Sequence, residues 1–234
     1  MDLVADGKER KVKKAASAFL VALSLQACVS DTTPRAVSTE AIQPSEVGRI
    51  AAFSAPTNCQ MLDAQRWRKG STTSVRSGCV VEAQSYVTIF GLSEITVPVG
   101  DAFSVSGDVA GFTTAAAAFP REVLLDYVRN RERDALSVQE PGMSYSKVRS
   151  SVLTGNGGVE GADVCVRFSF NAISADPSRR DGTVSGVRCA RLDPNTATVE
   201  EAMLEVMAFF PNGSAPPANF EGLANQAISS LRYR

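Results

Sequence analysis

The residues best suited to chemistry in this chain are a serine, a lysine and scattered carboxylates, because the sequence contains no histidine. That absence excludes Ser-His and Cys-His nucleophile pairs and histidine-ligated zinc sites. Ser144 and Lys147 have the Ser-x-x-Lys spacing at which a lysine one helical turn away can activate a serine. The Lys-Thr-Gly element that accompanies such a pair is absent, and Pro141-Gly142 favours a loop just upstream. We therefore predict no catalytic residue.

Carboxylates offer a second chemistry, since glycan cleavage needs only two acids that are close in space. The candidates that lie in or beside expected strands are Glu82, Glu94, Asp101 and Asp108. Exposed strand acids usually form a solvated face, so this remains an alternative. A glycine-rich segment at residues 155–161 lacks the spacing and the lysine of a phosphate loop, which favours a turn.

A cluster of cations surrounds the only tryptophan of the chain. The candidate binding patch consists of Arg66, Trp67, Arg68, Lys69 and Arg76. Arginine and tryptophan are enriched where partners bind, and such a patch suits an acidic protein, a lipopolysaccharide phosphate or a peptidoglycan carboxylate. The alternative is a tryptophan half buried under the stems of its own arginines.

A second basic group is expected to be a solvated helix face. Arg129, Arg131 and Arg133 alternate with acidic residues along a stretch that has helical periodicity.

The N-terminal segment has the order of parts that a secretory signal needs. Basic residues precede an apolar stretch at residues 15–25, and Ala27 follows as the small residue before the cut. Leu25-Gln26-Ala27-Cys28 resembles the lipobox of bacterial lipoprotein precursors. The resemblance implies that residues 1–27 are removed and that Cys28 carries acyl chains, palmitate among them. The apolar stretch is too short to cross a membrane, which takes about twenty residues.

The same resemblance bears on location and partners. Val29 follows the cysteine where an aspartate would favour the inner membrane, so we expect an outer-membrane protein that faces the periplasm. Without residues 1–27 the chain has 19 basic and 22 acidic residues, a net charge of −3. This mild acidity argues against nucleic acid as a ligand, because phosphate binding needs a concentrated basic face.

Four cysteines remain after Cys28, and their spacing favours disulfides in an oxidising compartment. We predict that Cys59 pairs with Cys79 and Cys165 with Cys189, which is the most natural of the three possible pairing schemes. The chain has no Cys-x-x-Cys, which argues against a zinc site or a redox pair, and we expect no cofactor and no metal.

Periodicity divides the rest of the chain into a flexible tether at residues 28–49 and one domain at 50–234. Strand signals occupy residues 50–110, a helix is expected over 120–136, and residues 164–170 and 183–192 form a hairpin. Thr198 to Glu201 fits a capping box, which predicts a helix through Phe210, and a last helix runs from Asn219 to Leu231. The disulfide between the hairpin strands is expected on their more polar face.

This order of elements predicts an α+β fold: an antiparallel sheet with helices packed on one face, stapled by two disulfides. The function we predict is a lipid-anchored cell-envelope protein that acts by binding, as an accessory or assembly subunit of an envelope complex with a protein partner. The alternative is a carboxylate-dependent envelope glycan hydrolase, and a third possibility is a purely structural lipoprotein.

Overall fold

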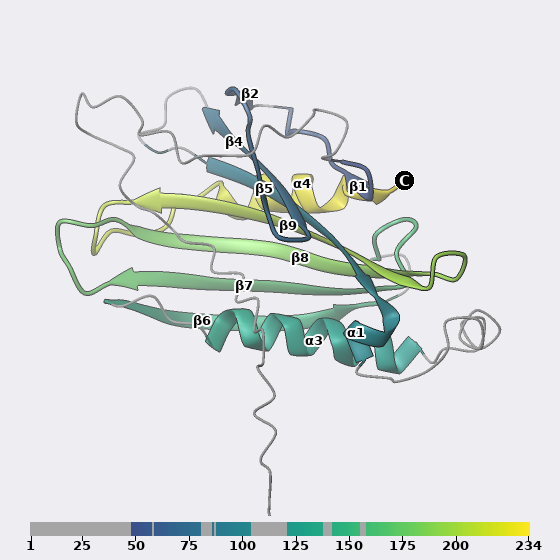
Figure 1. The fold of residues 1–234 in the computed structure, drawn as a ribbon. Helices are drawn as coiled ribbons and strands as arrows, with labels where there is room; N and C mark the ends of the chain where they lie inside the picture. Colours follow the sequence, from purple (N-terminus) through teal and green to yellow (C-terminus); the bar gives the residue numbers. More distant parts are fainter. Residues whose placement is uncertain are drawn as a thin grey trace, which may run out of the picture.

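A computed structural model describes residues 48–57, 59–80, 86, 88–103, 121–137, 142–154 and 158–234. The chain is mainly an antiparallel sheet with few helices (Figure 1). The strands are β1 (Ala51–Ala52), β2 (Gln60–Met61), β3 (Gln65–Lys69), β4 (Thr72–Val80), β5 (Thr88–Pro98), β6 (Met143–Leu153), β7 (Val164–Ser174), β8 (Asp181–Asp193), β9 (Thr198–Phe210) and β10 (Arg232–Tyr233). The helices are α1 (Val99–Phe103), α3 (Arg121–Ser137) and α4 (Phe220–Ser229).

One eight-stranded sheet organises the fold. Its strand order is β2-β4-β5-β9-β8-β7-β6, with β3 paired to β4 beside β2, and every pair is antiparallel. The short strands β1 and β10 form a separate pair. Strand β9 lies between β5 and β8 and is hydrogen-bonded to both along its length, so it is the centre of the sheet.

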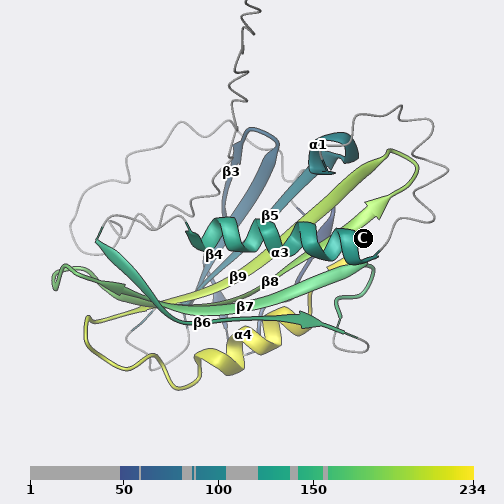
Figure 2. The ribbon, with the colours of Figure 1, turned by 90° about the horizontal axis from the view of Figure 1, so that it is seen from below.

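The expectation that the helices pack on one face is wrong. Helices α3 and α4 lie on opposite faces of the sheet (Figure 2). The α4 side buries the largest apolar cluster, which includes Phe90, Leu204 and Phe220. The α3 side buries a smaller one around Val128 and Val166. The physical reason is that the central strands carry apolar side chains at both odd and even positions, so each face needs a cover.

The predicted helix over residues 198–210 is also wrong, because this segment is strand β9. Its alanines, glutamates, methionines and leucines are good helix formers, which explains the expectation. Two neighbouring strands pair with the segment over its whole length, and this tertiary pairing outweighs the local preference. Glu201 and Glu205, which a surface helix would expose to water, are instead buried side chains of a central strand.

Other expected elements are confirmed. The helix expected over 120–136 is α3, the hairpin is β7 with β8, and the last helix is α4. Asn219 stands at the N-cap of α4 without a side-chain capping hydrogen bond, and its carboxamide oxygen accepts one from the Tyr86 hydroxyl instead. Among the described residues, no helix is long and apolar enough to cross a membrane.

Both disulfides have the predicted pairing. Cys59 is joined to Cys79, and Cys165 to Cys189, its register partner on the adjacent strand. The second disulfide does not lie on a polar face as expected: both its cysteines are buried in the apolar cluster under α4. This follows from the two-sided burial of the sheet, which leaves β7 and β8 no polar face at this point.

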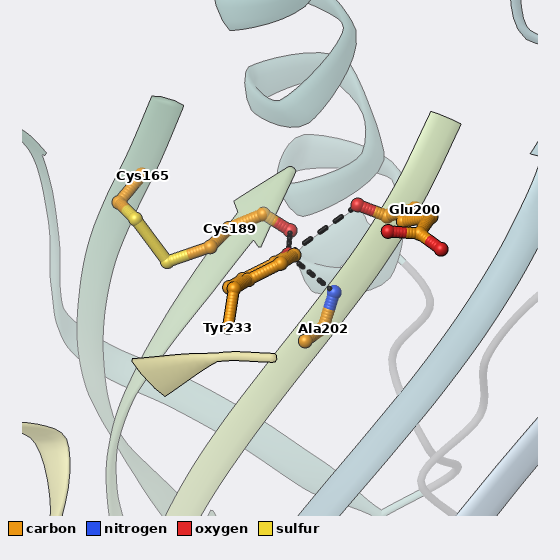
Figure 3. Close-up of a disulfide and its surroundings, with 5 residues drawn as sticks. All are labelled: Cys165, Cys189, Glu200, Ala202 and Tyr233. Atoms are coloured by element: carbon orange, nitrogen blue, oxygen red, sulfur yellow. Dashed lines mark hydrogen bonds between the residues drawn. A yellow bond between two sulfur atoms is a disulfide. The ribbon is translucent and has the colours of Figure 1, made fainter. Parts of the chain in front are cut away.

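Beside this disulfide, the buried hydroxyl of Tyr233 makes hydrogen bonds with the backbone of β8 and β9 (Figure 3). The Tyr233 hydroxyl donates to the carbonyl oxygen of Cys189 at 2.8 Å and accepts from the backbone N–H of Ala202 at 3.0 Å. Tyr233 therefore fixes the C-terminal segment to the ladder between β8 and β9. A buried hydroxyl with both a donor and an acceptor partner meets the usual requirement for burying a polar group.

Candidate functional site

The predicted patch lies on a hairpin at the edge of the sheet, here called the basic hairpin and formed by residues 65–80. Among the described strands β3 pairs with β4 alone, while β4 also pairs with β5, and Lys69 lies opposite Thr72 across a two-residue turn. Gly70 has φ +60° in this turn, a conformation that glycine adopts without strain. The hairpin contains no acidic residue.

The five patch residues divide between the two faces of the hairpin. Side chains alternate along a strand, so Arg66 and Arg68 share one face, while Trp67 and Lys69 share the other. The Arg76 guanidinium lies over the Trp67 ring, 5.0 Å from its centroid, so these two side chains form a cation–π pair. Trp67 is half-buried, whereas Arg66, Arg68 and Lys69 are exposed.

Arg76 also faces a second group of charges deeper in the sheet. A Cβ on Gly91 of the next strand would lie 3.6 Å from the Arg76 Cγ, so the arginine stem lies close above that glycine. Gly91 in turn is the register partner of Glu205 on β9. Burial lowers the pKa of Arg76, and the negative charge of Glu205 opposes that shift.

The charges beneath α3 form an internal charge cluster around Arg188, a fully buried residue of β8. Its members are Arg76, Arg131, Arg188, Glu132, Glu201 and Glu205, with the hydroxyl of Tyr127. Arg188 donates through Nη1 to Glu201 and through Nη2 to the Met203 sulfur at 3.0 Å. The cluster contains three arginines and three glutamates, so its charges balance when all three carboxylates are ionised.

Glu201 is the best-satisfied carboxylate of this cluster. Its Oε1 accepts from Arg188, and its Oε2 accepts from the Tyr127 hydroxyl at 3.1 Å and from Arg131 Nε at 3.3 Å. Two residues of α3 are thereby bound to the sheet. Arg131 was expected on a solvated helix face, and this expectation is wrong because Glu201 draws the side chain inward; Arg129 and Arg133 are exposed.

Glu132 makes fewer polar contacts than Glu201 does. Its Oε2 lies 4.0 Å from Arg188 Nε, and within the described part of the chain neither atom has a hydrogen-bond partner. Burial raises the pKa of Glu132 to about 7, with Arg188 opposing the shift and Glu205 and Glu201 adding to it. Burial likewise raises the pKa of Glu205, against the attraction of Arg76 and Arg188.

Sequence reasoning missed this cluster, although a signal was present. Glu201, Met203, Glu205 and Met207 occur at every second position of β9, while Ala202, Leu204, Val206 and Ala208 occupy the positions between. Such alternation indicates a strand with one charged and one apolar face. It was hidden by the helix-forming composition of the same segment.

Of the other catalytic candidates, those that the structure describes are not arranged as the predicted sites require. Ser144 and Lys147 lie in strand β6, where three-residue spacing does not place side chains one helical turn apart, and Lys147 has φ +53° at a bulge. Asp101 is exposed on α1. Glu82 and Asp108 lie outside the described residues, as does Cys28.

Glu94, the remaining carboxylate candidate, has a structural role. It accepts hydrogen bonds from the backbone N–H groups of Gly48, Ile50 and Ala51, at 3.2, 3.2 and 2.8 Å. Burial raises the pKa of Glu94, and these N–H groups oppose the shift. The carboxylate therefore holds the segment that follows the expected tether against β5.

In comparisons with known proteins, no protein-family model and no curated protein matches this chain. Among solved structures, LpqN of Mycobacterium tuberculosis, described as involved in cell envelope biogenesis, is similar at 13% identity and a TM-score of 0.38. The match covers 78% of this chain and 82% of LpqN. In the described residues, no group of histidine, cysteine and acidic side chains could hold a metal ion.

Proposed function

We propose that this chain is a lipid-anchored cell-envelope protein that acts by binding an anionic envelope component through its basic hairpin, as an accessory subunit. Anchoring through Cys28 and an outer-membrane location rest on the lipobox resemblance. Two disulfides in the domain support an oxidising compartment, where such bonds form and persist.

One observation carries the binding role. Of the two charged regions described above, the basic hairpin carries charge of one sign at exposed positions, whereas the internal charge cluster contains both signs and is mostly buried. The internal charge cluster pairs arginines with glutamates and fixes α3 to the sheet. A surface region whose charges are all positive favours an anionic partner, whereas the arginines of the internal cluster are paired with glutamates of the same fold.

Affinity purification of the acylated protein from native membranes tests this role. The hairpin variant Arg66→Gln/Arg68→Gln/Lys69→Gln removes three positive charges, and the α3 variant Arg121→Gln/Arg129→Gln/Arg133→Gln removes three from exposed positions elsewhere. We expect a stoichiometric envelope component to co-purify with the wild type and the α3 variant and to be lost from the hairpin variant. A protein that purifies alone, or equal retention by both variants, would contradict the proposal.

A further inference from the structure

Strand β6 lies at the edge of the sheet opposite to the basic hairpin (Figure 1). Among the strands that the structure describes, it pairs with β7 alone. An edge strand directs backbone N–H and C=O groups away from its sheet at every second residue, and these groups can pair with another chain. The consecutive residues Lys147 to Ser151 are all exposed, so neither face of the strand is covered there. The middle of this edge is therefore accessible to a partner.

A bulge divides β6 into two parts. Its register with β7 shifts between Ser146 and Arg149, and Lys147 has φ +53° at this point. Bulges and lysines hinder pairing locally and are among the means by which proteins protect an edge. From Arg149 to Leu153 the register with β7 is unbroken, so this segment keeps the regular geometry that a further strand needs. An added strand would pair with residues 149–153.

The side chains of this segment that point to the α4 side form a basic site. Arg149 lies opposite Ser169 on β7, and Ser151 lies opposite Arg167, so the two arginines are diagonal neighbours on one face. Arg167 donates to the side-chain oxygen of Asn225 on α4, a neutral group that orients the guanidinium without cancelling its charge. Within the described ranges, Arg149 has no hydrogen bond or ion pair. The accessible edge therefore has two positive charges beside it on one face.

Charge decides between two occupants of this edge, a second copy of the chain and a different protein. Strand β6 contains Lys147 and Arg149 and no acidic residue, so pairing two copies through β6 would bring like charges together. An extended segment with acidic side chains at every second position would place carboxylates beside Arg149 and Arg167. The acid nearest to Asn225 along α4, Glu221, is exposed and forms no ion pair with the described residues. An acidic partner is thus favoured.

We propose that β6 is a second binding surface, at which an extended acidic segment of a protein partner joins the sheet as a further strand. Backbone hydrogen bonds along residues 149–153 supply affinity, and Arg149 and Arg167 select for acidic side chains. Val152 points to the α3 side, because it lies opposite Val166 of the apolar cluster under α3, and favours an apolar residue at the alternate positions. The proposal goes beyond the binding role of the basic hairpin and does not depend on it.

Peptide titration tests the charge preference. The probes are two labelled peptides, one of alternating valine and glutamate and one of alternating valine and lysine, and fluorescence anisotropy measures their binding to the purified protein. We expect only the acidic peptide to bind. The β6 variant Lys147→Gln/Arg149→Gln should bind it about tenfold more weakly, from about threefold for each cross-strand pair of opposite charges. The α3 variant and the hairpin variant are controls that should bind like the wild type.

Alternate N-methylation of the acidic peptide tests the backbone pairing. Successive N–H groups of an extended strand point to opposite edges, so methylating the nitrogens of the valines alone or of the glutamates alone blocks one edge at a time. A strand added to β6 uses one edge only. We therefore expect one methylated peptide to lose binding and the other to keep it. Equal binding by the two peptides, whether retained or lost, would overturn the proposal.

Three further results would overturn it. The first is the absence of saturable binding of the acidic peptide. The second is a loss of binding in the hairpin variant with none in the β6 variant, which would assign the peptide to the basic hairpin. The third is a purified protein that light scattering shows to be a dimer and that the β6 variant makes monomeric, which would assign the edge to a second copy. Circular dichroism spectra and melting temperatures establish that all variants are folded.

Discussion

The internal charge cluster and the basic hairpin use the same residue types for different ends. In the cluster, Arg188 is buried between carboxylates, and Glu201 binds both it and α3. On the hairpin, Arg66, Arg68 and Lys69 are exposed on a segment without acids. The difference teaches that a charge paired within the fold contributes to stability, whereas an exposed group of charges of one sign is the better candidate for binding a partner.

Removing the arginine at the centre of the cluster should have the largest effect. Arg188→Met leaves Glu201 and Glu132 as buried carboxylates without their main counter-charge. Loss of one partner of a buried ion pair costs about 3–5 kcal/mol, so urea unfolding should give a free energy lower by that amount. A cost below about 1 kcal/mol would mean that the cluster is not a structural unit.

A glycine beside the cluster tests how tightly this face is packed. A Cβ at position 186 would lie 2.4 Å from Phe168 Cζ and 2.7 Å from the Leu204 carbonyl oxygen, so Gly186→Ala forces the strands apart. We expect a loss of about 3 kcal/mol, at the upper end for overpacking. Gly222→Ala is the matched control: its Cβ meets nothing within 4 Å, and alanine is favoured in helix α4. Similar thermal stability of the two variants would refute the packing described here.

The pH dependence of stability isolates Glu132. Its folded-state pKa of about 7 lies above the ordinary glutamate value, so the folded protein binds this proton more tightly than the unfolded chain. The resulting stabilisation is complete below about pH 4.5 and is lost as the pH rises through 7, which amounts to on the order of 3 kcal/mol.

Glu132→Gln should remove most of this pH dependence while the fold persists. Glu205 is shifted in the same direction and should leave a smaller residual slope. Urea unfolding of both proteins at several values between pH 5 and pH 8 provides the measurement. Identical slopes would show that Glu132 is not the titrating group.

Neutralising the hairpin should change stability least. Arg66, Arg68 and Lys69 are exposed, and surface substitutions of this kind usually alter the free energy of unfolding by less than about 0.5 kcal/mol. The hairpin variant should therefore unfold at the same urea concentration as the wild type while losing its partner. A loss of more than about 1 kcal/mol would assign these residues a structural role.

The same kind of comparison explains which parts of the fold and of the candidate site can be predicted from the sequence. The β7–β8 hairpin and both disulfides are predictable because they are local: the alternation of β7 indicates the strand, and cysteines 20 and 24 residues apart favour these two bonds. The cluster is not, because Arg188 and Glu201 meet only through strand register, and β9 has the composition of a helix. The basic patch is visible in the sequence as residue types, but its division between two faces requires the pairing of β3 with β4.

The central claim is that a partner covers the basic hairpin in the cell envelope. Arginine modification in native envelopes is the most direct test of this claim. Intact envelopes and purified protein are treated with phenylglyoxal, and mass spectrometry compares the modification rates of Arg66 and Arg68 with those of Arg129 and Arg133 on α3. The account predicts that Arg66 and Arg68 are protected in the envelope while Arg129 and Arg133 react equally in both samples. Hairpin arginines that react as fast in the envelope as in the purified protein would contradict it.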